Sequence, residues 1–393
     1  MRILHTSDWH LGHVLYNYDR REEQGAMLEQ MAAIVKQEQP DVFLLAGDVY
    51  DSTQPSSSVQ KMFANAMVRI HEACPSMRII CISGNHDSGS KHVIFKTPWE
   101  LLNVSMLGML PREEEGDQDL IVNIEGKGYV VAVPYTPDRL LPEGLFVRLQ
   151  EQVASMNEQE QLPVVLMAHL AVSGSDYRGH DNASETVVGG MECQSLETFG
   201  EGYDYVALGH IHRAQTLRGS KGRVRYSGTP LAVNFDEAMD EEEHGVTLVE
   251  ISAHGDLPSI KVIPIHNPRP LVTLPVDGFG EWPEVRQLFG SFPDDIPAYI
   301  RLNVLVDGRL PVGANDEAQQ IAALKQCRYC LINAKRKDQV VPSSGFQAMT
   351  TTEFQQMTPM EVAQRYLESQ GDVFDEGLAT LFNEVMKGID DED

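Results

Sequence analysis

Polar side chains follow several short apolar runs of this sequence, at the point where each run ends. The first run is followed by aspartate and histidine, the second by aspartate, the third by asparagine and histidine, and two later runs by histidines. The set is Asp8, His10, Asp48, Asn85, His86, His169, His210 and His212. Because open α/β sheets place ligands at the carboxyl ends of their strands, we expect these side chains to lie together. Asp8 and His10 are two positions apart, so in an extended segment both side chains point the same way.

This mixture of side chains suits divalent metal ions. Carboxylate, amide and imidazole groups bind Mn²⁺, Fe²⁺ or Zn²⁺, and the lack of thiolates in the set argues against a structural zinc site. Two ions need a shared ligand, and a carboxylate is the simplest bridge. Two divalent ions with the carboxylates of Asp8 and Asp48 leave a formal charge of +2, which attracts a phosphodiester. Two ions roughly 3.5–4 Å apart can activate a water molecule and hold the phosphate oxygens during in-line attack.

The elements that must position these residues alternate between strand and helix. The apolar run 41–46 predicts a buried strand, and runs 2–7 and 78–82 predict two more. Between them, 20–38 and 57–73 have the apolar spacing of helices. Strand, polar turn and helix therefore repeat through the first part of the chain, which is typical of a layered α/β domain built from βαβ units.

The middle of the chain continues this domain. Its predicted elements are strands at 129–133, 164–168 and 205–208 and a surface helix at 143–161. Short strands separated by turns then continue to about 265 and predict a second, more antiparallel sheet packed on the first. Residues 173–190 are rich in Gly and Ser, and we expect them to form a loop over the site.

Two prolines in the segment 267–270 mark a boundary, since proline resists both helix and central strand. We therefore divide the chain into an α/β/β/α sandwich domain (1–266), a small α+β capping domain (267–340) and a linker with a helical tail (341–393). The predicted elements of the cap are strands at 299–306 and 328–335 and a helix at 316–325. In the tail, Thr358 and Glu361 have the spacing of a capping box. The apolar stripe beyond them fits either a core-packing helix or a partner-docking helix, and its acidic terminal setting favours docking.

The net charge of −27 argues at first against a nucleic-acid partner, because phosphate binding usually requires a basic surface. The charge is unevenly distributed, however. Residues 353–393 hold eleven acidic and two basic side chains, a net of −9, whereas residues 301–338 hold seven basic and four acidic, a net of +3. Lys335, Arg336 and Lys337 in this basic segment are either a solvated charge run or contacts to a DNA backbone.

The remaining composition indicates a reduced, cytoplasmic protein. Five cysteines are few and odd in number, so they imply no disulfide framework. Cys327 and Cys330 have the spacing of half a zinc or redox motif, but without a second pair we interpret them as two positions on a strand. The first residues run straight into a strand and leave no room for a signal peptide, and no apolar run is long enough to span a membrane.

Five of these motifs occur in the order found in a known family. They are Asp8-x-His10, Gly47-Asp48, Gly84-Asn85-His86-Asp87, His169 and Gly209-His210-Ile211-His212. The chain thereby resembles the calcineurin-like metallophosphoesterases. Residues 5–12, 207–215 and 234–237 make the resemblance closer to the SbcD nuclease family.

The resemblance implies roles for individual residues. One metal ion would be held by Asp8, His10, Asp48 and His212, and the second by Asp48, Asn85, His169 and His210. His86 would face the scissile phosphate and protonate or stabilise the leaving oxygen, with Asp87 orienting it. Asp51 is expected to line the site, His5 to be structural, and His13 receives no role.

The same resemblance implies partners and an activity. It indicates Mn²⁺-dependent exonuclease and endonuclease cleavage of DNA by a homodimer, with the tail bound to an SbcC-type ATPase that alone uses ATP. Two alternatives remain: a phosphoesterase for small substrates such as cyclic nucleotides or phosphoproteins, and a scaffold that keeps the fold without chemistry. Small-substrate enzymes do not need residues 270–393, and the complete ligand set speaks against a scaffold.

Overall fold

The computed structural model describes residues 1–94, 96–112, 116–177, 193–239 and 244–337, and in the tail residues 357, 358, 360, 361, 364, 365, 367, 374, 378 and 382. The chain forms two compact units. Of the described residues, the first unit comprises those within 1–177 and 193–271, and the second comprises those from 272 onward.

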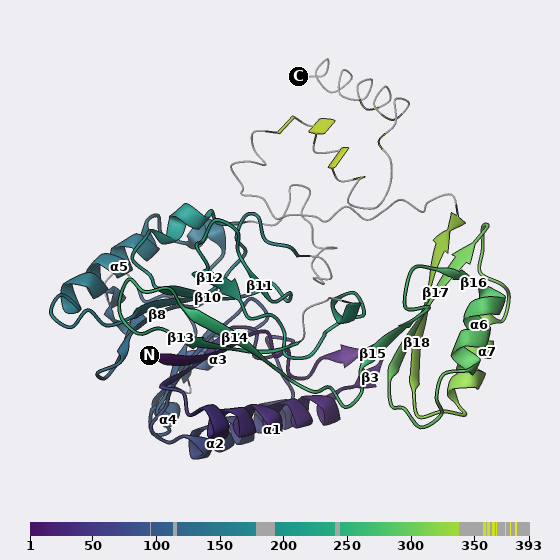
Figure 1. The fold of residues 1–393 in the computed structure, drawn as a ribbon, viewed down its shortest axis with the longest axis horizontal. Helices are drawn as coiled ribbons and strands as arrows, with labels where there is room; N and C mark the ends of the chain where they lie inside the picture. Colours follow the sequence, from purple (N-terminus) through teal and green to yellow (C-terminus); the bar gives the residue numbers. More distant parts are fainter. Residues whose placement is uncertain are drawn as a thin grey trace. The chain divides into compact units, whose positions relative to one another are not determined.

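The first sheet of unit one is built from the N-terminal βαβ repeats. Its strands are, in spatial order, β14 (Ser259–Pro264), β13 (Gly245–Glu250), β1 (Arg2–Thr6), β4 (Val42–Ala46), β5 (Arg78–Ile82) and β6 (Val104–Leu107). Figure 1 labels β13 and β14 of this sheet. From β1 to β6 all neighbours are parallel, and α1 (Arg21–Glu38) and α2 (Ser57–Ala73) make the crossovers that parallel strands require. The hairpin of β2 (Val14–Leu15) and β3 (Tyr18–Asp19) and the short helices α3 (Gly89–Ile94) and α4 (Lys96–Glu100) complete this half.

The second sheet differs from the prediction. Its spatial order is β11 (Gln215–Thr216), β12 (Val224–Tyr226), β10 (Tyr205–Gly209), β9 (Val164–His169), β8 (Gly128–Val133) and β7 (Ile121–Ile124). The central pairings, from β12 to β8, are parallel, and only the two edge pairings are antiparallel. The expectation of a more antiparallel sheet is wrong, because the later strands β13 and β14 join the first sheet instead. Fully buried apolar runs such as β9 are typical of parallel sheets covered on both faces.

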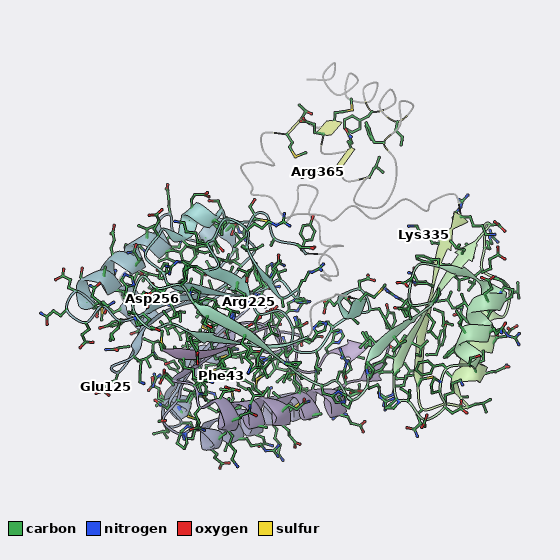
Figure 2. All side chains as sticks on the ribbon, in the orientation of Figure 1. Phe43, Glu125, Arg225, Asp256, Lys335 and Arg365 are labelled. Carbon is green, nitrogen blue, oxygen red and sulfur yellow. The ribbon has the colours of Figure 1, made fainter. Side chains whose placement is uncertain are left out.

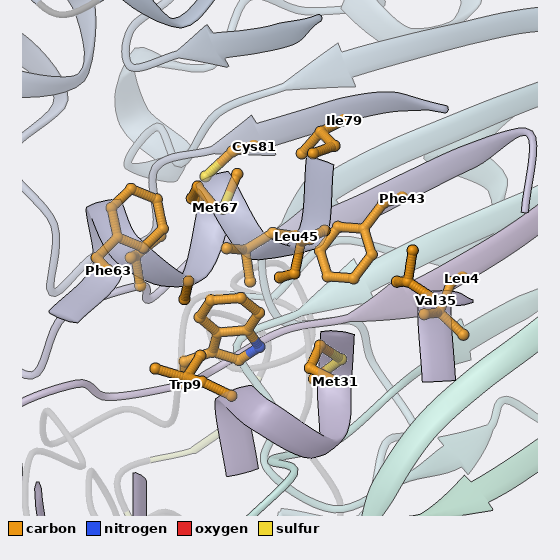
Figure 3. Packing of buried hydrophobic residues seen from close by; sticks show 14 of the residues in the cluster. Leu4, Trp9, Met31, Val35, Phe43, Leu45, Phe63, Met67, Ile79 and Cys81 are labelled. Carbon is orange, nitrogen blue, oxygen red and sulfur yellow. The ribbon is translucent and has the colours of Figure 1, made fainter. Parts of the chain in front are cut away.

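The two faces of the first sheet have different neighbours. Phe43 and Leu45 of β4 pack with Met31 of α1 and with Phe63 and Met67 of α2 (Figure 3). The alternate residues of the strand point to the other side, as the period of two requires. There Val42 and Leu44 of β4 belong to a cluster with Val165 and Met167 of β9 and with Ala207 of β10.

The outer face of the second sheet is covered by α5 (Leu145–Met156), whose buried residues include Phe146, Leu149 and Val153. The layers therefore follow the predicted α/β/β/α order, and the α/β sandwich is confirmed. The helix is shorter than the predicted 143–161, because the side chain of Asn157 bonds both the N–H and the carbonyl of Leu162 and turns the chain.

The second unit is a small α+β fold. Its strands are β15 (Leu271–Leu274), β16 (Gly280–Glu281), β17 (Tyr299–Val306) and β18 (Arg328–Arg336), and its helices are α6 (Trp282–Gly290) and α7 (Ala314–Ala322). The helix α6 is absent from the prediction, and α7 begins two residues before the predicted start. Trp282, Val285 and Phe289 of α6 are buried against Ile300 and Leu302 of β17.

In the tail, the predicted capping box is present. The main-chain N–H of Thr358 donates to Glu361 Oε2 (2.7 Å), and the N–H of Glu361 donates to Thr358 Oγ1 (3.3 Å). Residues 178–190 of the loop predicted at 173–190, and most of the tail's apolar stripe, lie outside the described residues. Within the part of the chain that the structure describes, no helix has both the length and the apolar character needed to cross a bilayer.

Candidate metal centre

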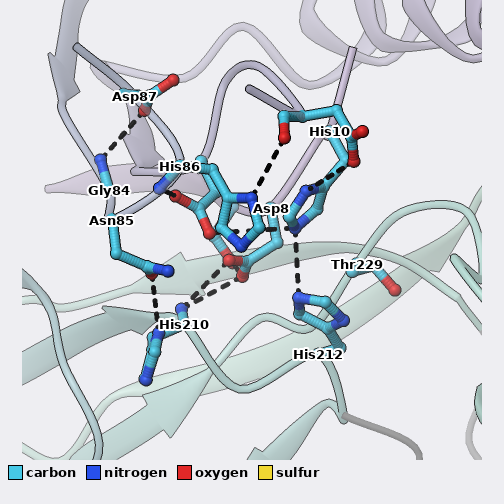
Figure 4. Close-up of polar contacts among 12 residues, drawn as sticks. Asp8, His10, Gly84, Asn85, His86, Asp87, His210, His212 and Thr229 are labelled. Atoms are coloured by element: carbon cyan, nitrogen blue, oxygen red, sulfur yellow. Dashed lines mark hydrogen bonds and ion pairs between the residues drawn. The ribbon is translucent and has the colours of Figure 1, made fainter. Parts of the chain in front are cut away.

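The carboxyl ends of five strands supply the predicted ligands. β1 leads to Asp8 and His10, β4 to Asp48, β5 to Asn85, β9 ends in His169, and β10 leads to His210 and His212. The first three strands belong to one sheet and the last two to the other. Their polar ends converge, as Figure 4 shows for Asp8, His10, Asn85, His210 and His212.

The backbone at these positions is not extended, contrary to the argument made from sequence for Asp8 and His10. Four of the predicted ligands have φ angles in the left-handed region: Asp8 (53°), His10 (43°), Asp48 (49°) and His210 (95°). Such angles are uncommon for residues other than glycine, and the backbone strain that they cause is found most often at functional sites. Main-chain bonds hold the two turns together, since the N–H of Asp8 donates to Gly47 O (3.0 Å) and that of His10 to Asp48 O (3.1 Å).

Two glycines of the motifs are required by close packing. A Cβ on Gly47 would lie 2.2 Å from His169 Nδ1, and a Cβ on Gly84 would lie 2.0 Å from Asp48 Oδ1. Gly47 also has a φ of 87°, which glycine adopts without strain. The Gly-Asp and Gly-Asn sequences thus allow the two strand ends to approach.

One group of donors surrounds a first position. Donor atoms of Asp8, His10 and His212 all lie within 4.8 Å of one another, and His10 Nε2 lies 3.1 Å from His212 Nε2. Asp48 Oδ2 is 3.8 Å from His10 Nε2. These residues are at most 4% exposed, so a cation bound here would be largely shielded from water.

A second group surrounds a neighbouring position. Asn85 Oδ1 lies 3.0 Å from both His169 Nε2 and His210 Nδ1. Asp48 Oδ2 is 3.4 Å from His169 Nε2, so the same carboxylate oxygen faces both groups. The structure therefore brings all seven predicted ligands together, with Asp48 between the two positions.

The charges of this cluster hold protons on two imidazoles. Burial would lower the pKa of His10, but Asp51, Asp48 and Asp8 together raise it to about 9. Burial likewise opposes the charge of His169, and Asp48 and Asp8 raise its pKa to about 9. The pKa of Asp48 is held well below its usual range by His169 and His10 despite burial, whereas burial raises that of Asp8. A metal ion that binds here would displace these protons, because an imidazole binds a metal ion only through a deprotonated nitrogen.

His86 lies beside the two groups and is half-buried. Its Nδ1 is 3.1 Å from the carbonyl oxygen of Asp51, and its main-chain N–H donates to Asp48 Oδ1 (2.9 Å). A ring nitrogen of His86 also lies within 4.8 Å of donors from His10 and Asp48. The prediction that His86 is not a ligand stays a prediction.

The carboxylate of Asp87 makes its hydrogen bonds to main-chain groups rather than to the side chain of His86, so its predicted orienting role stays a prediction. It accepts hydrogen bonds from the main-chain N–H groups of Val49 (3.1 Å), Tyr50 (3.0 Å) and Gly84 (2.9 Å). It thereby joins the turn that carries Asp48 to the turn that carries Asn85 and His86. Its effect on the site is to fix these two turns relative to each other.

The sequence did not predict the groups that form hydrogen bonds with these histidines on the side away from the two metal positions. The carbonyl of Ala46 lies 2.8 Å from His169 Nδ1, and Glu237 Oε1 lies 2.7 Å from His212 Nδ1. The buried side chain of Gln24 on α1 bonds the carbonyl of His10 (2.8 Å) and the N–H of Gly12 (3.0 Å). The only signal for Gln24 in the sequence is a polar residue next to the apolar stripe of a helix.

The other predicted site residues divide between the two units. Asp51 Oδ1 lies 3.4 Å from His10 Nδ1, beside the first position. Lys335 of β18 (Figure 2) lies over the ring of Phe279, 5.9 Å from its centroid. Lys337 forms ion pairs with Glu281 (2.8 Å) and Asp307 (3.1 Å), and Arg336 ends β18 in the same unit.

Comparison with known proteins agrees with this geometry. Residues 1–214 match the family model of calcineurin-like phosphoesterases. The SbcD component of the nuclease SbcCD from Rhodobacter capsulatus is 35% identical, over 72% of this chain and 74% of that protein. Proteins of the same name from Bacillus subtilis and Escherichia coli K12 are 26% and 25% identical, over 100% and 83% of this chain and 100% and 82% of theirs.

The chain therefore belongs to the calcineurin-like phosphoesterase family, in the group that contains the SbcD nucleases. Together with the buried cluster of aspartates and histidines, this makes it a metal-dependent hydrolase of phosphate esters. The donors fit a pair of divalent ions, because each position is surrounded by oxygen and imidazole nitrogen atoms without thiolates.

Proposed function

We propose that this chain cleaves phosphodiester bonds of DNA with two Mn²⁺ ions, as an exonuclease on double-strand ends and an endonuclease on single strands and hairpins. The observation that carries the proposal is the placement of Asp48 Oδ2 between two donor groups, 3.8 Å from His10 Nε2 and 3.4 Å from His169 Nε2. A carboxylate shared between two such groups would hold two ions close together, as two-metal phosphoryl chemistry requires. The names of the relatives supply the substrate class.

The residues divide the work between holding ions and moving a proton. Asp8, His10, Asp48 and His212 would hold one ion, and Asp48, Asn85, His169 and His210 the other. When bound, the ions supply Lewis-acid polarisation of the phosphate and activation of the attacking water. His86 Nδ1 faces the carbonyl of Asp51, an acceptor, so Nδ1 carries a proton. Nε2 would donate to the leaving oxygen when the ring is the doubly protonated imidazolium, and the ring would then keep its Nδ1 proton as the neutral form.

The proposal extends to a complex that acts in the cytoplasm in DNA repair and recombination. The relatives are components of an SbcCD nuclease, and this supports an SbcC-type ATPase as the partner. We propose a homodimer within a heterotetramer, with the tail (341–393) docking the ATPase and ATP used only there. The second unit would bind DNA as a cap through Lys335, Arg336 and Lys337. The ion pairs of Lys337 leave less of its charge for phosphate than a free lysine would have.

The decisive experiment is His86→Ala, assayed on blunt duplex and hairpin DNA with Mn²⁺. We expect cleavage to fall by about 10²–10⁴-fold, the usual contribution of a general acid, while two ions per chain are still bound. The exposed His266 gives a matched control, since His266→Ala should leave both properties unchanged. Full activity of His86→Ala would refute its role, and loss of an ion would make it a ligand. Wild-type turnover of cyclic nucleotides with intact DNA left uncut would favour a small-substrate enzyme.

A further inference from the structure

Glu237 is a fully buried carboxylate behind the first metal position. It begins a single 3₁₀ turn (Glu237–Met239), 25 residues after His212, and has no exposed surface. Burying an ionised carboxylate is costly unless hydrogen-bond donors surround it. The donors that face Glu237 therefore show what this residue is placed there to do.

Donors face both oxygens of this carboxylate. Oε1 lies 2.7 Å from His212 Nδ1 and 3.1 Å from Asn234 Nδ2. Oε2 accepts from the main-chain N–H of Val233 (2.7 Å) and from the hydroxyl of Thr229 (3.4 Å). The N–H of Thr229 also donates to the carbonyl of His212 (2.9 Å), so the loop holds both the ring and the backbone of that histidine.

We infer that Glu237 is a positioning residue for the metal centre, which holds His212 with its proton on Nδ1 and its Nε2 lone pair toward Asp8 and His10. Nδ1 donates because a carboxylate can only accept. Nε2 then faces the first position, 3.1 Å from His10 Nε2. This inference rests on the proposed role of His212 as a ligand. A carboxylate behind a ligating histidine fixes the ring and makes its other nitrogen more basic.

The second position lacks the same support at His169. His169 Nδ1 lies 2.8 Å from the carbonyl of Ala46, a neutral acceptor in the main chain of β4. A carbonyl fixes the tautomer but adds no negative charge. The contribution of Glu237 is therefore expected mainly at the ion held by Asp8, His10 and His212.

Glutamine cannot replace Glu237, although it has the same shape. If its oxygen faces His212, its amide N–H₂ faces the N–H of Val233, and two donors meet. If it is flipped, the N–H₂ faces His212 Nδ1, which must then accept and place its proton on Nε2, where the metal ligand atom should be. Either orientation weakens the first position.

The test is manganese binding to the full-length Glu237→Gln protein, measured by calorimetry and by electron paramagnetic resonance. We expect the affinity for one ion to fall by about 10–100-fold, the usual effect of losing such a partner, and the signal of a coupled Mn²⁺ pair to be lost at limiting metal. Glu250→Gln, at the exposed last residue of β13, is the matched control, because it makes the same change of side chain away from the metal centre and should leave affinity and signal unchanged. Wild-type affinity and signal in Glu237→Gln would overturn the inference.

A second comparison distinguishes an effect of Glu237 through the ring of His212 from an effect of losing its negative charge or of unfolding the protein. In a His212→Ala background, Glu237→Gln should cause no further loss of affinity, because the residue acts through that ring. An equal loss in both backgrounds would overturn the inference. Should Glu237→Gln not fold, ¹⁵N NMR of the metal-free wild type decides, with His212→Ala assigning the resonance: a proton on Nδ1 supports the inference and a proton on Nε2 contradicts it. None of these measurements depends on DNA cleavage.

Discussion

His5 and His10 are five residues apart and both fully or nearly buried, yet their surroundings drive their charges in opposite directions. His5 lies within β1 and has no exposed surface, and His10, beyond the end of the strand, is 3% exposed. Burial lowers the pKa of His5 to about 3, while the pKa of His10 is raised to about 9. Burial is common to both, so it cannot explain the difference.

The difference lies in the groups that face each ring. His5 Nδ1 is 2.9 Å from the hydroxyl of Tyr205 in the second sheet, and the nearby charge of Arg225 also lowers its pKa. His10 and His169 instead face carboxylates, of which Asp48 is common to both. A buried histidine between the sheets is thus a neutral packing residue, and the same residue at the strand ends belongs to a cation site.

The substitution expected to have the largest effect on the difference between His5 and His10 is Asp48→Asn, which removes the carboxylate between the two metal positions. We expect both ions to be lost and the pKa values of His10 and His169 to fall. Metal catalysis contributes several kcal/mol, so activity should drop on the order of 10³-fold at about 1.4 kcal/mol per tenfold. Calorimetry with Mn²⁺ and a DNA cleavage assay measure the two effects.

Asp41, which precedes β4, is a control for this substitution at the opposite end of the same strand. Its carboxylate bonds the N–H of Arg2 (2.7 Å), so Asp41→Asn perturbs the sheet but not the metal position. It should keep two ions per chain. Retention of one tightly bound ion in Asp48→Asn would contradict the shared role.

The effect of pH on metal binding sharpens the contrast. Because the pKa values of His10 and His169 are about 9 in the metal-free protein, both rings carry protons at pH 7. The protonated rings stabilise the metal-free fold, and this contribution is complete below about pH 6.5, the ordinary pKa of histidine. That stabilisation is lost as pH rises through 9, while metal affinity rises over the same range. Each imidazole proton released should change the affinity by up to about tenfold per pH unit.

Calorimetry at pH 7 in two buffers of different ionisation enthalpy counts the protons released by Mn²⁺. We expect a count approaching two, and a lower count in Asp51→Asn, since Asp51 helps to raise the pKa of His10. An affinity that is equal at pH 6 and pH 8 would show that these rings are already neutral.

The sequence predicted strands best where apolar residues run without interruption. The helix at 57–73 and the strands at 78–82 and 299–306 have the predicted bounds. The direction of strands in the second sheet could not be predicted in this way, because a continuous apolar run is typical of a parallel sheet but also fits the core of a sandwich. The sheet to which β13 and β14 belong depends on long-range pairing with β1.

For the site, the sequence predicted which residues meet but not how the backbone brings them together. Asp8 and His10 converge through left-handed turns, which the extended-segment argument did not include. Asp87 was assigned to its neighbour His86, whereas its hydrogen bonds reach the distant turn at Val49 and Tyr50. Glu237 has no local pattern that links it to His212, because its position depends on the loop after β12.

His5 gives the smallest effect and tests the other side of the comparison. Its folded pKa of about 3 lies below the ordinary value of 6.5, so the folded state binds fewer protons than the unfolded chain between these values. Its contribution to the free energy of unfolding is therefore complete above pH 6.5 and is lost as pH falls toward 3, by at most about 1.4 kcal/mol per pH unit. His5→Asn should lower stability at pH 7 but flatten the fall of the free energy of unfolding with acid, whereas His266→Asn, at an exposed site, should do neither.

Urea unfolding between pH 7 and 4, followed by the fluorescence of Trp9 and Trp99 in a Trp282→Phe background, measures unit one alone. An unchanged slope in His5→Asn would mean that His5 already accepts a proton in the folded protein, and that burial between the sheets does not keep it neutral.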